Sequence, residues 1–84
     1  MEKVAIIGDG GWVTAMAILL DAAGKKTRIW GHVPEYIEEM RSTRRNRLFM
    51  EDVDIPPGIG FETELPAAME WADLVVTAVP SQFL

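Results

Sequence analysis

The sequence predicts an α/β fold with a mainly parallel, doubly wound sheet, and three observations support this class. The first is a short, continuously apolar run at residues 4–7 that meets a cluster of glycines. The second is a long apolar stretch that follows these glycines and ends at Gly24. The third is the order of the predicted segments, which is β-α-β-α-(β)-α-β along the chain.

The first strand and the first helix flank the glycine cluster. Residues 4–7 show no alternation of apolar and polar side chains, which is typical of a strand buried on both faces of a parallel sheet. We expect a helix over residues 11–23, with Thr14 and Asp21 as its polar exceptions. Because this helix is apolar almost all round, it should pack on the sheet with one side and on another structure with the other. Gly24 is well placed as the left-handed residue that ends it.

A second strand and an amphipathic helix follow. Residues 27–30 are the expected strand that closes a βαβ unit, with a right-handed connection. After a turn at Gly31 and His32, Pro34 fits the first turn of a helix that reaches about Arg44. The apolar stripe of this helix is formed by Val33, Tyr36, Ile37 and Met40.

The second half of the chain supplies the last elements. Residues 46–60 are irregular, and Phe61 is expected in a short strand. Thr63 is the expected cap of a short helix that tolerates Pro66 in its first turn. Residues 74–79 form a further run without alternation and are predicted to be another buried, parallel-type strand.

Composition excludes several classes of protein. The 84 residues allow one domain at most, and the net charge of −5 argues against a general nucleic-acid binder. Without cysteine the chain has neither a disulfide framework nor a cysteine zinc site, which is compatible with the cytoplasm. One histidine and no cysteine provide no metal or Ser-His-Asp constellation. The N-terminus lacks the layout of a signal peptide, and no apolar run approaches the length of a membrane span.

Two charged clusters are interpreted as solvated. The basic run at residues 41–47 has the residue types of a phosphate or nucleic-acid site, but a solvated helix end fits an acidic chain better. The acids Glu51, Asp52 and Asp54 lack the spacing of a calcium-binding loop, so a solvated loop is expected there.

The glycine cluster has part of a phosphate-binding pattern. Gly8-x-Gly10-x-x-Val13 covers two of the three glycines of the G-x-G-x-x-G fingerprint of dinucleotide-binding (Rossmann) domains. The first glycine permits the tight turn, and the second lets a pyrophosphate approach the backbone. Val13 stands where the third glycine normally allows close packing, so it should push the helix outward or crowd its neighbours. Asp9 would repel a pyrophosphate unless it points away. The alternative is a glycine turn used only for chain reversal.

The end of the second strand leaves the choice of cofactor open. An acidic residue about 20 positions beyond the glycines would bind the ribose hydroxyls and select NAD. Gly31 and His32 stand there instead. His32 could stack on adenine, contact the 2′-phosphate of NADP, or be a solvated turn residue. The expected cofactor is therefore NAD or NADP.

Four motifs spread over the chain match a known family. In order, they are Gly8-x-Gly10-x-Trp12-x-Thr14-Ala15, Arg28-Ile29-Trp30-Gly31, Thr43-x-x-Asn46 and Ala72-Asp73-Leu74-Val75-Val76-x-Ala78-Val79-Pro80-Ser81-Gln82. Together they resemble NAD(P)-dependent glycerol-3-phosphate dehydrogenase. The resemblance implies an oxidoreductase that transfers hydride between glycerol 3-phosphate and dihydroxyacetone phosphate and supplies a precursor for phospholipid biosynthesis.

The resemblance also implies a set of cofactor-binding residues. Gly11 and Trp12 would offer the backbone of the turn to the pyrophosphate. His32 stands where the family often has an arginine, and Phe49 matches a family tyrosine near the cofactor. The implied set is Gly8, Gly10, Gly11, Trp12, His32, Phe49 and, lining the cofactor cleft at the end of a strand, Val79, Pro80 and Ser81. No catalytic residue and no metal ligand is assigned.

Length sets the expected scope of this function. Members of the family run to several hundred residues, and their catalytic lysine and substrate-phosphate groups lie beyond the point where this sequence stops. We therefore expect residues 1–84 to be the N-terminal part of a dinucleotide-binding domain, without the substrate and catalytic domain and without activity of its own.

Two alternatives stay open at this point. One is the same part of another NAD(P)-dependent dehydrogenase, and the other is a degenerate, non-catalytic Rossmann domain that acts in association. The expected partners are the dinucleotide and the missing C-terminal part of the enzyme. Exposed apolar helix faces and strand edges also predict self-association.

Overall fold

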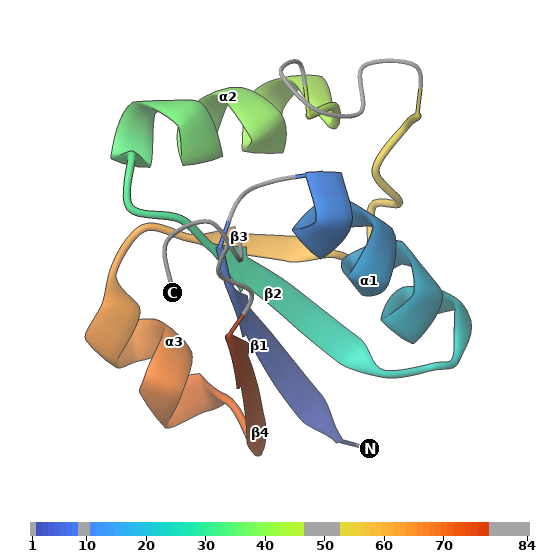
Figure 1. Cartoon of the computed structure of the whole chain (residues 1–84), viewed down its shortest axis with the longest axis vertical. Helices are drawn as coiled ribbons and strands as arrows, with labels where there is room; N and C mark the ends of the chain where they lie inside the picture. The colour runs from blue at the N-terminus through green and yellow to red at the C-terminus, as the bar shows by residue number, and fades with distance from the viewer. Residues whose placement is uncertain (1, 9–10, 47–52, 78–84) are drawn as a thin grey trace.

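The computed structural model describes residues 2–8, 11–46 and 53–77, and within them strands and helices alternate in the predicted order (Figure 1). The elements are β1 (Lys3–Ile7), α1 (Gly11–Ala22), β2 (Lys26–Trp30), α2 (Pro34–Thr43), β3 (Gly60–Glu62), α3 (Leu65–Trp71) and β4 (Leu74–Thr77). The predicted α/β class and the predicted order are confirmed.

The four strands form one parallel sheet in the order β3-β2-β1-β4. The chain moves outward from β1 through β2 to β3 and then returns to place β4 on the other side of β1. This reversal makes the carboxyl ends of β1 and β4 the topological switch point, which is where open α/β sheets bind their ligands.

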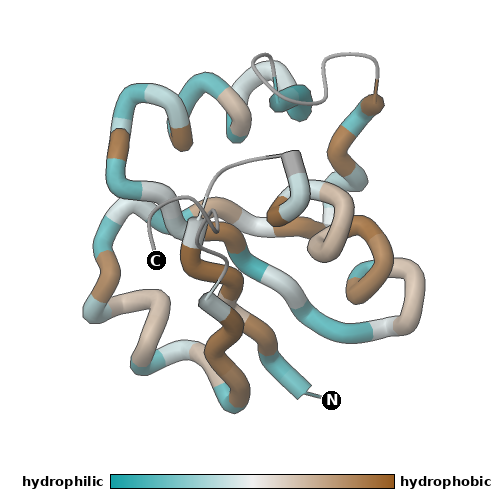
Figure 2. The backbone as a smooth tube through the Cα atoms, in the orientation of Figure 1, coloured by the Kyte–Doolittle hydropathy of each residue, from teal (hydrophilic) through white to brown (hydrophobic). Residues whose placement is uncertain are grey.

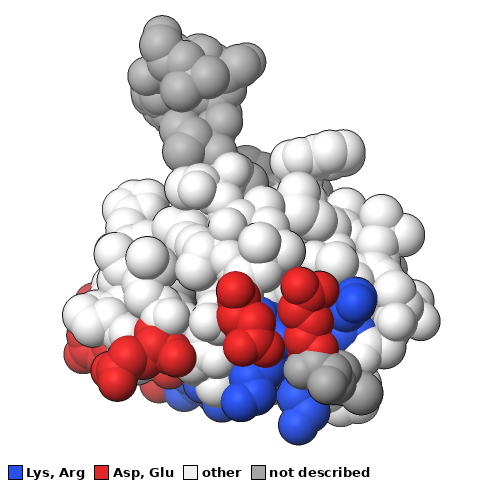
Figure 3. Space-filling model, turned by 90° about the horizontal axis from the view of Figure 1, so that it is seen from below, with Lys and Arg blue, Asp and Glu red and all other residues white. Residues whose placement is uncertain are grey.

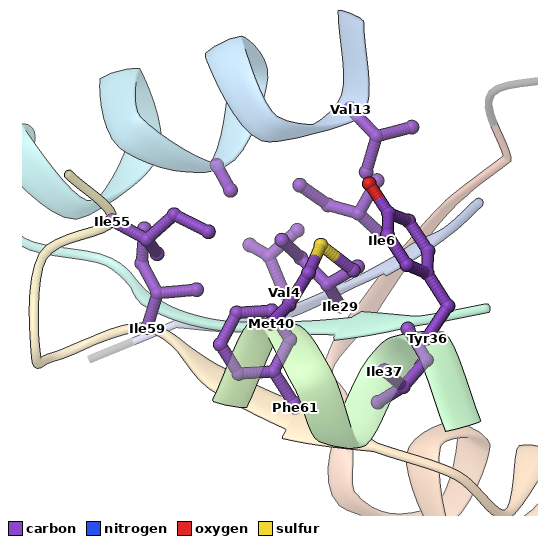
Figure 4. Close-up of a cluster of buried hydrophobic side chains, with 11 residues drawn as sticks. Val4, Ile6, Val13, Ile29, Tyr36, Ile37, Met40, Ile55, Ile59 and Phe61 are labelled. Atoms are coloured by element: carbon purple, nitrogen blue, oxygen red, sulfur yellow. The ribbon is translucent and has the colours of Figure 1, made fainter. Parts of the chain in front are cut away.

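The helices cover both faces of the sheet, with α1 and α2 on one face and α3 on the other (Figure 1). The main hydrophobic core lies beneath α1 and α2 (Figure 4) and consists of Val4, Ile6, Val13, Ala17, Ile29, Tyr36, Ile37, Met40, Ile55, Ile59 and Phe61. Because side chains alternate along a strand, Ala5 faces the side opposite to Val4 and Ile6. Ala5 and Ala68 of α3 are both fully buried, which agrees with α3 covering this face of the sheet.

The ends of the helices test the predicted caps. Gly24 has a φ of 86°, which confirms it as the left-handed residue after α1. Thr63 is not the cap of α3: the cap position is Glu64, which makes no side-chain capping bond. Glu62 takes the local donors instead, because its carboxylate accepts the backbone N–H groups of Thr63 and Glu64, each at 3.1 Å.

The apolar stripe of α2 is confirmed except at its first member. Tyr36, Ile37 and Met40 are buried as predicted. Val33 is 39% exposed, because it lies before the helix, in extended backbone at the cap position, and not on its inward face.

The two apolar strands differ in burial, although the sequence predicts both to be buried. Figure 2 shows hydrophobic residues along both β1 and β4. The central residues of β1 are fully buried, whereas Leu74 of β4 is 47% exposed and Val75 and Val76 are only half-buried. The prediction is therefore wrong for the described part of β4, because β4 lies at an edge of the described sheet. Residues 78 and 79 lie outside the described residues.

The basic run at residues 41–47 begins in the last turn of α2, and its described part, residues 41–46, is only partly solvated; Arg47, like Glu51 and Asp52, lies outside the described residues. Arg45 is exposed and pairs at 3.0 Å with the exposed carboxylate of Asp54, as a solvated helix end predicts. Arg44 is half-buried and adopts left-handed backbone with a φ of 58°. Its guanidinium donates to the backbone oxygens of Ile59 at 2.7 Å and of Pro56, and burial lowers its pKa below the ordinary value. Arg44 therefore anchors the segment that leads into β3, and the predicted solvated role is wrong for this residue.

Charged side chains of both signs lie next to each other on the face seen in Figure 3. This view looks from the side on which the N-terminus lies in Figure 1. Lys25 and Glu2 form an ion pair at 3.3 Å. Within residues 2–8, 11–46 and 53–77, no helix has the length and apolar character needed to cross a membrane.

Candidate functional site

The carboxyl ends of three strands meet at the end of β1. Ile7 is the register partner of Trp30 on β2 and of Thr77 on β4. The backbone N–H of Gly8 then donates to the carbonyl of Trp30 at 2.7 Å, which continues the pairing one residue past β1. The structure therefore places the first predicted site residue, Gly8, at the switch point of the sheet.

Gly8 has the conformation that makes this turn possible. Its φ is 142°, in a region that residues with a Cβ rarely adopt, so a glycine is needed where the chain leaves β1. Helix α1 begins three residues later, at Gly11, and its first turn has no acidic side chain. The first N–H groups of a helix lack intrahelical acceptors and form its positive end. The arrangement of strand, glycine and helix N-terminus is therefore suited to bind a phosphate group.

Two other predicted site residues, Trp12 and His32, follow the ends of β1 and β2 along the sequence. Trp12 is the second residue of α1 and is 74% exposed. His32 is exposed and lies two residues after β2, whose last carbonyl accepts the N–H of Gly8. The remaining predicted members, together with Asp9, lie outside the described residues: Gly10, Phe49, Val79, Pro80 and Ser81.

Val13, which replaces the third glycine of the fingerprint, is part of the hydrophobic core. It is 2% exposed, and Figure 4 shows it between α1 and the side chains of Ile6 and Tyr36. The core thus accommodates this side chain by packing it against neighbouring apolar groups. Its effect on cofactor affinity stays a prediction.

The sequence did not predict a cluster of buried polar side chains that includes Thr14 of α1. Asn46 and Thr14 are almost fully buried, and the amide nitrogen of Asn46 donates to the hydroxyl of Thr14 at 2.8 Å. The hydroxyl of Tyr36 in turn donates to the amide oxygen of Asn46. Thr14 and Asn46 occur in the motifs of the resemblance, and Thr14 is a polar exception in an apolar helix, so the sequence marks both residues as unusual. It does not show that they contact each other, because that contact depends on tertiary packing.

The described part of the chain contains no candidate metal site. Residues 2–8, 11–46 and 53–77 contain no group of three histidine, aspartate or glutamate side chains that could hold an ion.

A parallel sheet with a glycine turn and a helix N-terminus at its switch point defines a Rossmann-type domain. A family model described as the N-terminus of NAD-dependent glycerol-3-phosphate dehydrogenase matches residues 3–84. The chain belongs to this family, so the resemblance seen in the sequence is confirmed.

Individual relatives agree with the family match. The chain is 38% identical over 82 residues to a glycerol-3-phosphate dehydrogenase [NAD(P)+] of Chlorobium phaeobacteroides, with 98% of this chain and 25% of that protein covered. A second such enzyme, from Salinibacter ruber, is 40% identical over 82 residues, with 98% and 24% covered.

The fold is also similar to solved structures. The crystal structure of glycerol-3-phosphate dehydrogenase from Coxiella burnetii superposes with a TM-score of 0.86 at 29% identity, over 95% of this chain and 25% of that one. The chain therefore spans about a quarter of the length of the relatives that it matches.

Proposed function

We propose that this chain binds the adenosine and pyrophosphate half of NAD or NADP in a glycerol-3-phosphate dehydrogenase. The observation that carries this proposal is Gly8, whose φ of 142° turns the chain from β1 toward the N-terminus of α1 at the switch point. The enzyme would transfer hydride between glycerol 3-phosphate and dihydroxyacetone phosphate, and thereby supply a phospholipid precursor in the cytoplasm. The relatives are glycerol-3-phosphate dehydrogenases [NAD(P)+], which supports this reaction and the choice of NAD or NADP.

Each site residue has a physical task in this proposal. Gly8 makes the turn, and the N–H groups of Gly11 and Trp12, which lack intrahelical acceptors at the start of α1, would donate to the pyrophosphate. His32, exposed after β2, would stack on adenine or meet the 2′-phosphate of NADP. When bound, the nicotinamide ring supplies the hydride acceptor, and the residues named here only hold the other half of the molecule. Phe49, Val79, Pro80 and Ser81 remain proposed members of the site.

The proposal also assigns the chain to one part of a larger domain. Leu74, Val75 and Val76 form an apolar run typical of an inner strand, but among the described residues β4 pairs only with β1. A further strand beside β4 would bury these side chains. We therefore propose that residues 1–84 are the N-terminal part of the dinucleotide-binding domain, and that the catalytic groups belong to a C-terminal part of the enzyme.

Titration calorimetry with the pure 84-residue chain tests the cofactor site. We expect heat of binding from ADP, NAD and NADP at millimolar concentration, because the proposed contacts involve the part that these molecules share. The difference between NAD and NADP reports whether His32 meets the 2′-phosphate. The same preparation should show no oxidation of glycerol 3-phosphate.

Two glycine variants provide a matched comparison. Gly8→Ala introduces a Cβ at the turn. Gly24→Ala introduces one at the other end of α1, where the backbone is left-handed with a φ of 86° and the added Cβ would meet no neighbouring atom within 4 Å. Both substitutions strain the backbone, but only Gly8→Ala should weaken the binding of ADP. Absence of heat with the unmodified chain would favour a degenerate, non-catalytic domain. Equal losses in both variants would remove Gly8 from the site.

A further inference from the structure

Three polar side chains from separate segments meet in the protein interior, and one of them comes from the first turn of α1. Thr14 belongs to α1, Tyr36 to α2, and Asn46 to the segment that follows α2. Their exposed fractions are 1% for Thr14, 8% for Tyr36 and 0% for Asn46, so all three are removed from water. Thr14 accepts from the amide nitrogen of Asn46 at 2.8 Å, and the amide oxygen of Asn46 accepts from the hydroxyl of Tyr36.

The cluster acts on the end of α1 that the proposed cofactor site uses. Helix α1 begins at Gly11, and Thr14 is its fourth residue. The side chain of Thr14 is therefore attached to the first turn of the helix. The residues before it carry the N–H groups that lack intrahelical acceptors. Restraining Thr14 therefore restrains the direction in which these N–H groups point.

Apolar packing alone would restrain this end less strictly. Val13 packs among Ile6 and Tyr36 (Figure 4), and such contacts are non-directional. A hydrogen bond has a preferred distance and angle, and in a buried site it is costly to leave unmade. Asn46 donates with one side-chain atom and accepts with another, so it links α1 and α2 through a single planar amide.

We propose that Asn46 is a positioning residue, which acts through Thr14 to orient the first turn of α1 for the pyrophosphate of the dinucleotide. This inference rests on the proposed function, because it assigns a role to residues that support the same site. Asn46 does not touch the cofactor; it sets the position of the backbone donors. Tyr36 completes the arrangement by donating to the opposite end of the amide.

The experiment compares two buried threonines that differ in location. Thr14→Val removes the hydroxyl that Asn46 binds and keeps the shape of the side chain. The matched control is Thr27→Val on β2: Thr27 is 2% exposed, and its hydroxyl donates to the carbonyl of Lys25 at 3.4 Å, away from the carboxyl ends of the strands. Thr14→Ser keeps the hydroxyl and tests for rescue.

Affinity for ADP is measured by calorimetry at a temperature where each variant is folded by circular dichroism. We expect Thr14→Val to weaken binding about five- to tenfold, as for the loss of one buried hydrogen bond. Thr27→Val and Thr14→Ser should bind as the unmodified chain does. Tyr36→Phe, which removes one hydroxyl from the other end of the cluster, should weaken binding in the same direction and serves if Thr14→Val does not fold.

A second readout needs no ligand. Backbone order parameters from nuclear magnetic resonance should fall at residues 11–13 in Thr14→Val and stay unchanged in Thr27→Val. Equal changes in both threonine variants, or unchanged affinity and order in Thr14→Val, would overturn the positioning role. If the unmodified chain binds no ADP, the proposed function fails, and the order parameters alone decide whether the cluster orients the turn.

Discussion

The two edge strands of the described sheet differ in how the chain covers them. At β3, Phe61 is 6% exposed, and Arg41 of α2 donates to its carbonyl at 2.6 Å. The guanidinium of Arg44 lies 5.1 Å from the centre of the Phe61 ring. At β4, Leu74 is 47% exposed although it belongs to an apolar run like that of β1. The chain covers the β3 edge with its own side chains, whereas β4 has the composition of an inner strand.

This difference shows how composition and position are linked in a parallel sheet. β3 is only three residues long, and short edge strands with cationic neighbours limit pairing with other chains. Among the described residues, β4 pairs only with β1, so its other edge forms no backbone hydrogen bonds with a strand of the described sheet. The edge at β4 is therefore where the proposed C-terminal part of the domain would continue the sheet.

Truncating one apolar side chain at each edge should give the largest difference. Phe61→Ala removes a ring from the core and should lower the free energy of unfolding by about 3 kcal/mol. Leu74→Ala should lower it by less than about 1 kcal/mol, because much of this side chain is already in water. Urea denaturation followed by circular dichroism measures both values. Equal losses would mean that Leu74 is covered in solution and that the two edges are alike.

Local sequence patterns predict the elements that form the site well. The apolar run of β1, the turn at Gly8 and the stop at Gly24 each depend on residues adjacent in the chain, and the structure agrees with all three. Burial of β4 was predicted wrongly because its pattern is that of an inner strand, whereas its exposure depends on what lies beside it. A pattern reports the environment for which a strand is suited, and the described chain supplies only part of that environment for β4.

Two neighbouring arginines of the basic run, Arg44 and Arg45, should differ in how much they contribute to stability. Arg44→Ala removes the donor to the carbonyls of Pro56 and Ile59 and should cost about 2–3 kcal/mol of unfolding free energy. Arg45→Ala, the matched control, breaks an exposed pair with Asp54 and should cost less than about 0.5 kcal/mol. Thermal and urea unfolding measure both. A small effect of Arg44→Ala would show that the β3 edge does not depend on this anchor.

Sequence reasoning did not separate these two arginines because they are neighbours in the same basic run. A solvated helix end and a helix end that binds a returning segment have the same local composition, and only the path of residues 53–59 decides between them. Asn46 was missed for the same reason. Its motif was visible, but its partners Thr14 and Tyr36 lie 32 and 10 positions away and meet only when α1 and α2 pack on the sheet.

The substitution Leu74→Lys should change stability least of all and should still reduce self-association of the chain through β4. Leu74→Lys places a charge on the edge strand β4, where a half-exposed position should tolerate it at a cost of about 0.5 kcal/mol or less. If the pure 84-residue chain self-associates through β4, the substitution should shift it toward monomer. Leu19→Lys is the matched control, because Leu19 is 71% exposed and belongs to helix α1 and not to an edge strand. Sedimentation velocity over a range of concentrations measures the distribution. An equal shift in both variants would indicate general hydrophobic contact, and a monomer at every concentration would show that the β4 edge does not pair with a second copy.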